Sequence, residues 1–180
     1  MNTTPPRTVV LTCHASMPCR AVHRLEVRVG PLGSGRLRLE YCLQADLAAL
    51  RLPARLAAPV RTDELWRHSC FEAFVRCEGA EGYREFNLAP SGAWAAYAFS
   101  GYRAGMSMLA EATPALEVRQ QSGCLVLDAT IATGCAGARG QLALAAVLEA
   151  RDGSLSYWAL RHPAGRPDFH HPEGFELEFS

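Results

Sequence analysis

Hydrophobic and polar residues alternate along much of this chain in runs of strand length. In the segments 24–29 and 36–46, every second residue is apolar and most of the residues between are charged or polar. A period of two predicts strands with one buried face and one wet face. The glycine-rich stretch 30–35 between them predicts a hairpin turn, so these two segments should form an antiparallel pair.

The second half of the chain continues this pattern. Ser122-Gly123 divides the segment 115–133 into two strands, and Asp152-Gly153 divides the segment 140–160 in the same way. Residues 142–150 are rich in alanine and leucine, which favour a helix, but their position before an Asp-Gly turn favours a strand. The segment 174–180 predicts a last alternating strand.

Residues 45–60 interrupt the alternation, and Pro53 and Pro59 prevent a long helix there. We interpret them as a crossing loop with at most a short helical turn. The whole pattern predicts an all-β protein, an antiparallel, jelly-roll-like β-sandwich of about ten strands. We expect an N-terminal arm at 1–20 and one sandwich domain at 21–180.

Composition agrees with one folded domain and narrows the partners. The chain has 180 residues, of which 49% are hydrophobic, and its 18 basic and 18 acidic residues balance. A balanced charge does not favour nucleic acid as a partner. The sequence has no apolar run long enough to span a membrane, and the apolar run at 9–11 is too short for a secretory signal. Seven cysteines without a C-x-x-C pair favour free thiols in a reducing cytoplasm.

The segment 66–76 carries polar residues where a core strand would be apolar. If it is a strand, Phe71 and its alternating neighbours form the core face, and Trp66, His68 and Glu72 share the other face. Those three side chains would then be available to a ligand. The alternative is an exposed glutamate beside a tryptophan at the rim of the sheet.

The next strand, 83–88, places Glu85 and Asn87 on one face, and a short link allows it to pair with the first. Glu72 should then lie near Asn87 or Glu85. Carboxylate, amide and indole groups on one sheet suit a sugar, whose hydroxyls need donors and acceptors and whose C–H face stacks on an aromatic ring. Alternatively, Glu85 pairs with a nearby arginine in solvent and Asn87 orders a turn.

The proline-rich loop 161–174 contains Asp168, His170 and His171. We expect it to contact a ligand or to be only structural. A metal site is not predicted, because adjacent histidines point apart in an extended segment. The sequence contains no nucleophile elbow, phosphate loop or zinc-protease motif, so we expect no enzymatic activity.

Three segments resemble a known family: "DELWRHSCFEAFVR", "YREFNLAPSGAWAAYAF" and "PDFHHPEGFELEF". They are similar to the DOMON-like superfamily, specifically its bacterial single-domain branch related to family-nine carbohydrate-binding modules. The resemblance implies a β-sandwich that binds either sugars or haem. It implies that Trp66 stacks on a sugar and that Glu72, six positions later, bonds its hydroxyls. The second stacking tryptophan of those modules has no counterpart in the loop around Phe169.

Three functions follow from these observations. The first is a non-catalytic domain that binds a carbohydrate or a sugar-like small metabolite and needs no cofactor. The second is a haem-binding electron-transfer domain, for which the resemblance implies a methionine and a histidine as axial ligands; the candidates are Met17, Met106 or Met108 with His68 or His170. The third is a protein-protein interaction module that uses exposed aromatic residues of segment 92–99. The sequence does not decide the oligomeric state.

Overall fold

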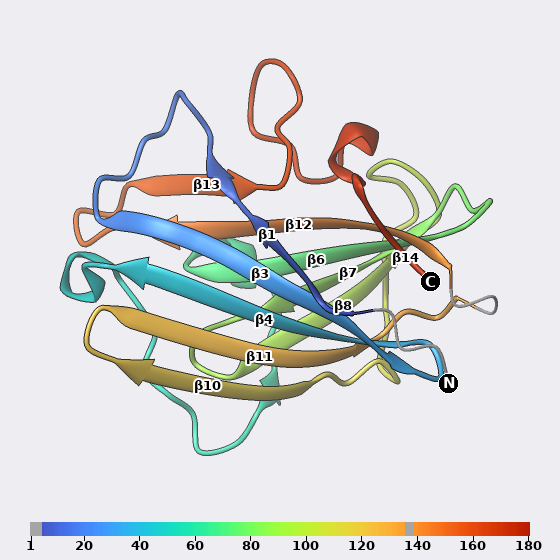
Figure 1. Cartoon of the computed structure of the whole chain (residues 1–180), viewed down its shortest axis with the longest axis horizontal. Helices are drawn as coiled ribbons and strands as arrows, with labels where there is room; N and C mark the ends of the chain where they lie inside the picture. Colours follow the sequence, from blue (N-terminus) through green and yellow to red (C-terminus); the bar gives the residue numbers. More distant parts are fainter. Residues whose placement is uncertain (1–4, 136–138) are drawn as a thin grey trace.

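The computed structural model, which describes residues 5–135 and 139–180, consists of two stacked β-sheets (Figure 1). The described strand pairs are antiparallel except for the short pair β5–β8, which is parallel. The predicted all-β sandwich is therefore confirmed. The strands of sheet A, in spatial order, are β1 (Arg7–Val10), β3 (Val22–Gly33), β4 (Arg36–Ala45), β11 (Cys124–Ala132) and β10 (Ala115–Gln121).

Sheet B is the larger layer. Its main path runs through β2 (Thr12–Cys13), β13 (Leu155–Ala159), β12 (Gly140–Glu149), β6 (Cys70–Cys77), β7 (Tyr83–Leu88), β8 (Ala93–Phe99) and β5 (Val60–Arg61). Two further strands pair off this path: β14 (Leu177–Phe179) with β12, and β9 (Ser107–Met108) with β8. The structure has more strands than the sequence predicts, because β1, β2, β5 and β9 each have only two to four residues and show no clear alternation.

The main core lies between the two sheets. It contains the alternating apolar residues that the sequence places on the inner face, among them Leu25 from β3, Tyr41 from β4 and Phe71 from β6. The predicted hairpins at 30–35 and 152–153 both form. The crossing loop contains one turn of 3₁₀ helix, Leu47–Ala49, as expected.

Sheet B is also covered on its outer face. A second apolar cluster, which includes Phe74, Tyr83, Tyr97 and Phe175, packs there beneath the loops. This cover explains the apolar run 142–148, because a strand buried on both faces needs no alternation. The expected aromatic patch of segment 92–99 is wrong: Tyr97 and Phe99 are buried in this outer cluster and Trp94 in the main core, so they offer no surface to a partner.

The N-terminal segment joins both layers. β1 pairs with β3 at the edge of sheet A, and β2 follows after one residue and pairs with β13 at the edge of sheet B. Leu11, between the two strands, is buried in the main core.

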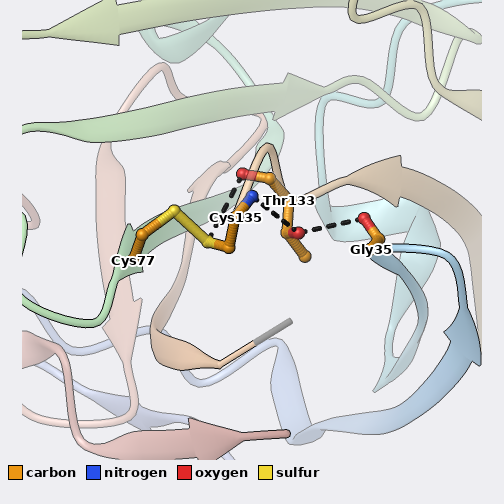
Figure 2. The surroundings of a disulfide bond; sticks show 4 residues. All are labelled: Gly35, Cys77, Thr133 and Cys135. Atoms are coloured by element: carbon orange, nitrogen blue, oxygen red, sulfur yellow. Dashed lines mark hydrogen bonds between the residues drawn. A yellow bond between two sulfur atoms is a disulfide. The ribbon is translucent and has the colours of Figure 1, made fainter. Parts of the chain in front are cut away.

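The expectation that all cysteines are free is wrong. Cys77, at the end of β6, forms a disulfide bond with Cys135, in the link between β11 and β12 (Figure 2). Thr133 positions this link: its hydroxyl donates to the carbonyl oxygen of Gly35 and accepts from the N–H of Cys135. The pairing connects residues far apart in sequence, which their spacing along the chain cannot reveal.

No helix in the described part of the chain is long and apolar enough to cross a membrane. The helical residues there form three single turns of 3₁₀ helix.

Candidate functional site

A cavity of about 370 Å³ opens on the outer face of sheet B. β6, β7, β8, β12 and β13 form its floor, and the loops that follow β8 and β13 form its walls. Four of the predicted ligand-binding residues line it: Trp66, Glu72, Glu85 and His170.

Glu72 lies on β6 and points away from the main core, since its neighbours Phe71 and Ala73 point into that core. Its residue surface is only 3% exposed, and its Oε1 atom has no hydrogen-bond partner among the described residues. Burial raises the pKa of Glu72 well above its usual value, and the nearby charge of Glu85 adds to the rise, whereas Arg103 opposes it. A buried oxygen without a partner is costly and leaves a bonding position for a ligand.

Glu85 lies on the neighbouring strand β7, two residues from Asn87, which stands directly opposite Glu72 in the register. The Asn87 amide donates to Glu85 Oε1 at 2.7 Å. Burial raises the pKa of Glu85 to about 7, although the bond from Asn87 and the charge of Arg103 lower it. The predicted proximity of Glu72, Glu85 and Asn87 is confirmed, with Asn87 fully buried beneath the cavity as a support for Glu85.

Among the residues that the structure describes, one arginine lines the cavity. It is Arg103, which comes from the loop after β8. Its guanidinium donates to Asp168 Oδ1 at 2.7 Å, and the Tyr102 hydroxyl donates to the other oxygen of the same carboxylate. Asp168 therefore ties the two wall loops together instead of lining the cavity itself.

His170 comes from the loop after β13 and is largely buried. Its Nδ1 atom lies 2.7 Å from the Tyr83 hydroxyl, which also accepts a hydrogen bond from the backbone N–H of Arg103. Nδ1 is therefore best assigned as the acceptor, which leaves a proton on Nε2, 3.9 Å from Glu85 Oε2. Burial lowers the pKa of His170 to about 4, and Arg103 contributes to the decrease. His170 is thus neutral at neutral pH.

Aromatic side chains form part of the cavity lining. Trp66 belongs to a 3₁₀ turn, Leu65–Arg67, is 37% exposed, and packs edge-on against Tyr97 with 6.1 Å between ring centroids. Tyr157 on β13 packs against Phe169 from the following loop, with 5.8 Å between their ring centroids. These rings offer apolar faces close to the buried carboxyl groups.

Two predicted residues lie away from the cavity. The His68 side chain is largely exposed, and its Nδ1 atom is 2.8 Å from a Glu149 carboxylate oxygen. The expectation that 66–76 is one strand is wrong for its first residues, because β6 begins only at Cys70. His171 accepts a hydrogen bond from the N–H of Glu173 and so caps a 3₁₀ turn at Pro172–Gly174.

Arg103 and Tyr157 also line the cavity, and the sequence does not predict them as site residues. Arg103 lies in an irregular loop and has a left-handed backbone, with φ of 52°, so no periodic pattern marks it. Tyr157 follows the strand alternation but is indistinguishable in sequence from an ordinary sheet residue. Among the described residues, no group of three or more histidine, cysteine, aspartate or glutamate side chains is arranged to hold a metal ion.

Comparisons with known proteins give a likeness of fold. No family model matches the chain, and no curated protein matches it either. A crystal structure of a protein from Bacteroides uniformis ATCC 8492, described as a "putative carbohydrate-binding protein", is similar with a TM-score of 0.65 and 14% sequence identity. The likeness covers 97% of this chain and 87% of that one. At this identity the comparison supports the sandwich fold.

Proposed function

We propose that this protein is a non-catalytic ligand-binding domain whose cavity on sheet B takes a carbohydrate or a sugar-like small metabolite. The observation that carries the proposal is the buried Glu72 oxygen, which has no partner among the described residues and lines one cavity with Glu85 and Trp66. Hydroxyl groups would supply the missing hydrogen bond, and an apolar ring face would stack on the indole. The description of the similar Bacteroides protein agrees with this proposal.

We infer that the resemblance to the DOMON-like superfamily and its family-nine relatives reflects common ancestry. Trp66 and Glu72, which that resemblance pairs in sugar binding, line one cavity here. Phe169 takes part in the same lining, where the resemblance would place a second tryptophan. Phenylalanine offers a smaller stacking surface than tryptophan does.

A haem site is less favoured by these residues. Met106 and His170 do line the same cavity. However, one ring nitrogen of His170 is bonded to Tyr83 and the other faces Glu85. An apolar porphyrin in this cavity would cover buried carboxyl groups without bonding to them, which is costly. The purified protein should therefore show no intense absorption band near 400 nm, a wavelength at which haem proteins absorb strongly.

The proposed cytoplasmic location is in tension with the disulfide bond, because oxidising compartments maintain such bonds and the cytoplasm reduces most of them. Alkylation of the free thiols in cell extracts, followed by mass spectrometry, would measure the oxidised fraction of Cys77. Complete alkylation in the native host would favour the cytoplasm, and protection of Cys77 would favour an oxidising compartment.

The first test is a thermal-shift panel of soluble sugars, sugar phosphates and nucleotide sugars. A ligand at one hundred times its dissociation constant adds about 2.7 kcal/mol to stability, which raises Tm by several degrees. We expect at least one sugar to raise Tm, and Trp66→Ala to remove that increase while the protein still folds, since Trp66 is partly exposed. Leu32→Ala, which removes an exposed side chain far from the cavity, should keep the increase. A shift that persists in Trp66→Ala would place the ligand elsewhere.

A further inference from the structure

The cavity has more acidic than basic groups available to a ligand. Glu72 and Glu85 both face it, and the one described cation in its lining is Arg103. The guanidinium of Arg103 also bonds to Asp168, so this one cation is shared among three carboxyl groups, Glu72, Glu85 and Asp168. His170, the remaining described basic side chain in the lining, is kept neutral by burial.

The two carboxyl groups are placed where one group could contact both. Glu72 and Glu85 lie on adjacent antiparallel strands in diagonal positions, since Glu72 stands opposite Asn87. Diagonal residues have Cα atoms roughly 7–8 Å apart and side chains within mutual reach. Asn87 satisfies Oε1 of Glu85, whereas Oε1 of Glu72 is unpartnered among the described residues.

A neutral sugar would satisfy this arrangement only in part. A hydroxyl group can bond to the free Glu72 oxygen, but it supplies no positive charge to two buried, neighbouring carboxyl groups. Their mutual repulsion and burial favour the protonated form, as the raised pKa of Glu72 indicates. A bound ammonium group would favour release of that proton, because it would supply the ionised carboxylates with both hydrogen-bond donors and a counter-charge. The indole of Trp66, at the same cavity, is the aromatic ring that best attracts a cation.

We propose, as an extension that rests on the proposed function, that the cavity selects an amine-bearing ligand, such as an amino sugar, with its ammonium group between Glu72 and Glu85. The sugar ring would then pack against Trp66. This names the chemical class of the ligand: a cationic polyol with one apolar ring face.

The test compares pairs of sugars that differ only at one position. Isothermal titration calorimetry at pH 7 and low salt would measure glucosamine against glucose and galactosamine against galactose, with N-acetylglucosamine as a ligand of similar shape without the charge. We expect the amino sugar of at least one pair to bind about tenfold or more tightly than its neutral partner. N-acetylglucosamine should lose this advantage.

Variants locate the preference. Glu72→Gln keeps the shape of the side chain but cannot ionise when an ammonium group binds, so it should reduce the ratio of the two affinities to near one. Glu117→Gln, on the exposed strand β10 of the other sheet, should leave the ratio unchanged. If Glu72→Gln fails to fold, the comparison of the sugars with the unaltered protein still decides the question.

The outcomes separate this inference from the proposed function. Neutral sugars that bind as tightly as amino sugars would overturn the preference for an amine and leave the sugar-binding proposal intact. No binding by any sugar of these pairs or of the thermal-shift panel would overturn both.

Discussion

Glu85 links the stability of the protein to pH. Its folded pKa is about 7, raised by burial from an ordinary value of 4.5. Between these values the folded protein holds a proton that the unfolded chain has released. The resulting contribution to stability is complete below pH 4.5 and is lost as the pH rises through about 7.

Glu85→Gln should remove the part of the pH dependence that comes from Glu85, whereas Glu72, whose pKa burial also raises, keeps a part of its own. We expect the unfolding free energy of the native protein, relative to that of the variant, to fall by up to about 3 kcal/mol as the pH rises from about 4.5 to about 7. Denaturant titrations at several pH values measure the difference. The unfolding free energies of the native protein and of the variant must be compared at each pH. His170, whose pKa is lowered to about 4, changes the stability of both proteins with pH in the opposite direction. A difference in unfolding free energy that stays constant with pH would contradict the prediction. The control is Glu117→Gln, which replaces an exposed glutamate in the same way.

Individual site residues could be predicted where the strand alternation holds. Glu72 and Glu85 were found because both lie inside regular, paired strands. The placement of His68 failed because a 3₁₀ turn precedes β6 and ends the period of two. The position of Arg103 depends on a loop conformation and on its bond to Asp168, which joins residues 65 positions apart. No local pattern contains that information.

At the scale of elements, sheet B shows that two features need different information: whether a segment forms a strand, and whether both faces of that strand are covered. The turn at Asp152-Gly153 identified β12 and β13 as a hairpin although the composition of β12 favours a helix. The coverage of the outer face was not predictable in the same way. It depends on loops that fold back over β6, β7 and β8, and the apolar residues responsible are scattered along the chain.

Gly140, at the start of β12, is expected to tolerate no side chain. A Cβ atom there would lie 2.4 Å from the carbonyl oxygen of Arg76 and 2.7 Å from the Phe179 ring. Gly140→Ala should therefore lower the unfolding free energy by about 1–3 kcal/mol, since β6 and β14 flank β12 on both sides here. Gly101→Ala, which meets no atom within 4 Å, should change it by less than about 0.5 kcal/mol. Equal effects in denaturant unfolding would contradict the close approach.

At the scale of the whole molecule, the fold class follows from the alternation, but the order of strands does not. Alternation identifies which face of a strand is buried and says nothing about its partner. β6 lies between β7, its neighbour in sequence, and β12, which begins 63 residues after the end of β6. Such pairings depend on the complementarity of whole faces, as does the disulfide between Cys77 and Cys135.

That disulfide should stabilise the whole sandwich. It joins residues 58 apart, and closing a loop of this length in the unfolded chain corresponds to about 4 kcal/mol. Reductant, or the double substitution Cys77→Ser with Cys135→Ser, should lower the unfolding free energy by roughly this amount in denaturant titrations. The double substitution Cys42→Ser with Cys124→Ser should leave the response to reductant in place, because those two thiols are free. Equal unfolding midpoints with and without reductant would mean that the bond is not formed in solution.

The division of the N-terminal segment between two sheets also affects how the chain folds during synthesis. β1 can pair with β3 as soon as the hairpin of β3 and β4 has left the ribosome. β2 has to wait, because its partner β13 is made about 140 residues later: the Thr12 hydroxyl bonds to the carbonyl oxygen of Ala159 across a separation of 147 positions. Until β13 has been synthesised, the edge of sheet B remains open and available to other nascent chains or to chaperones.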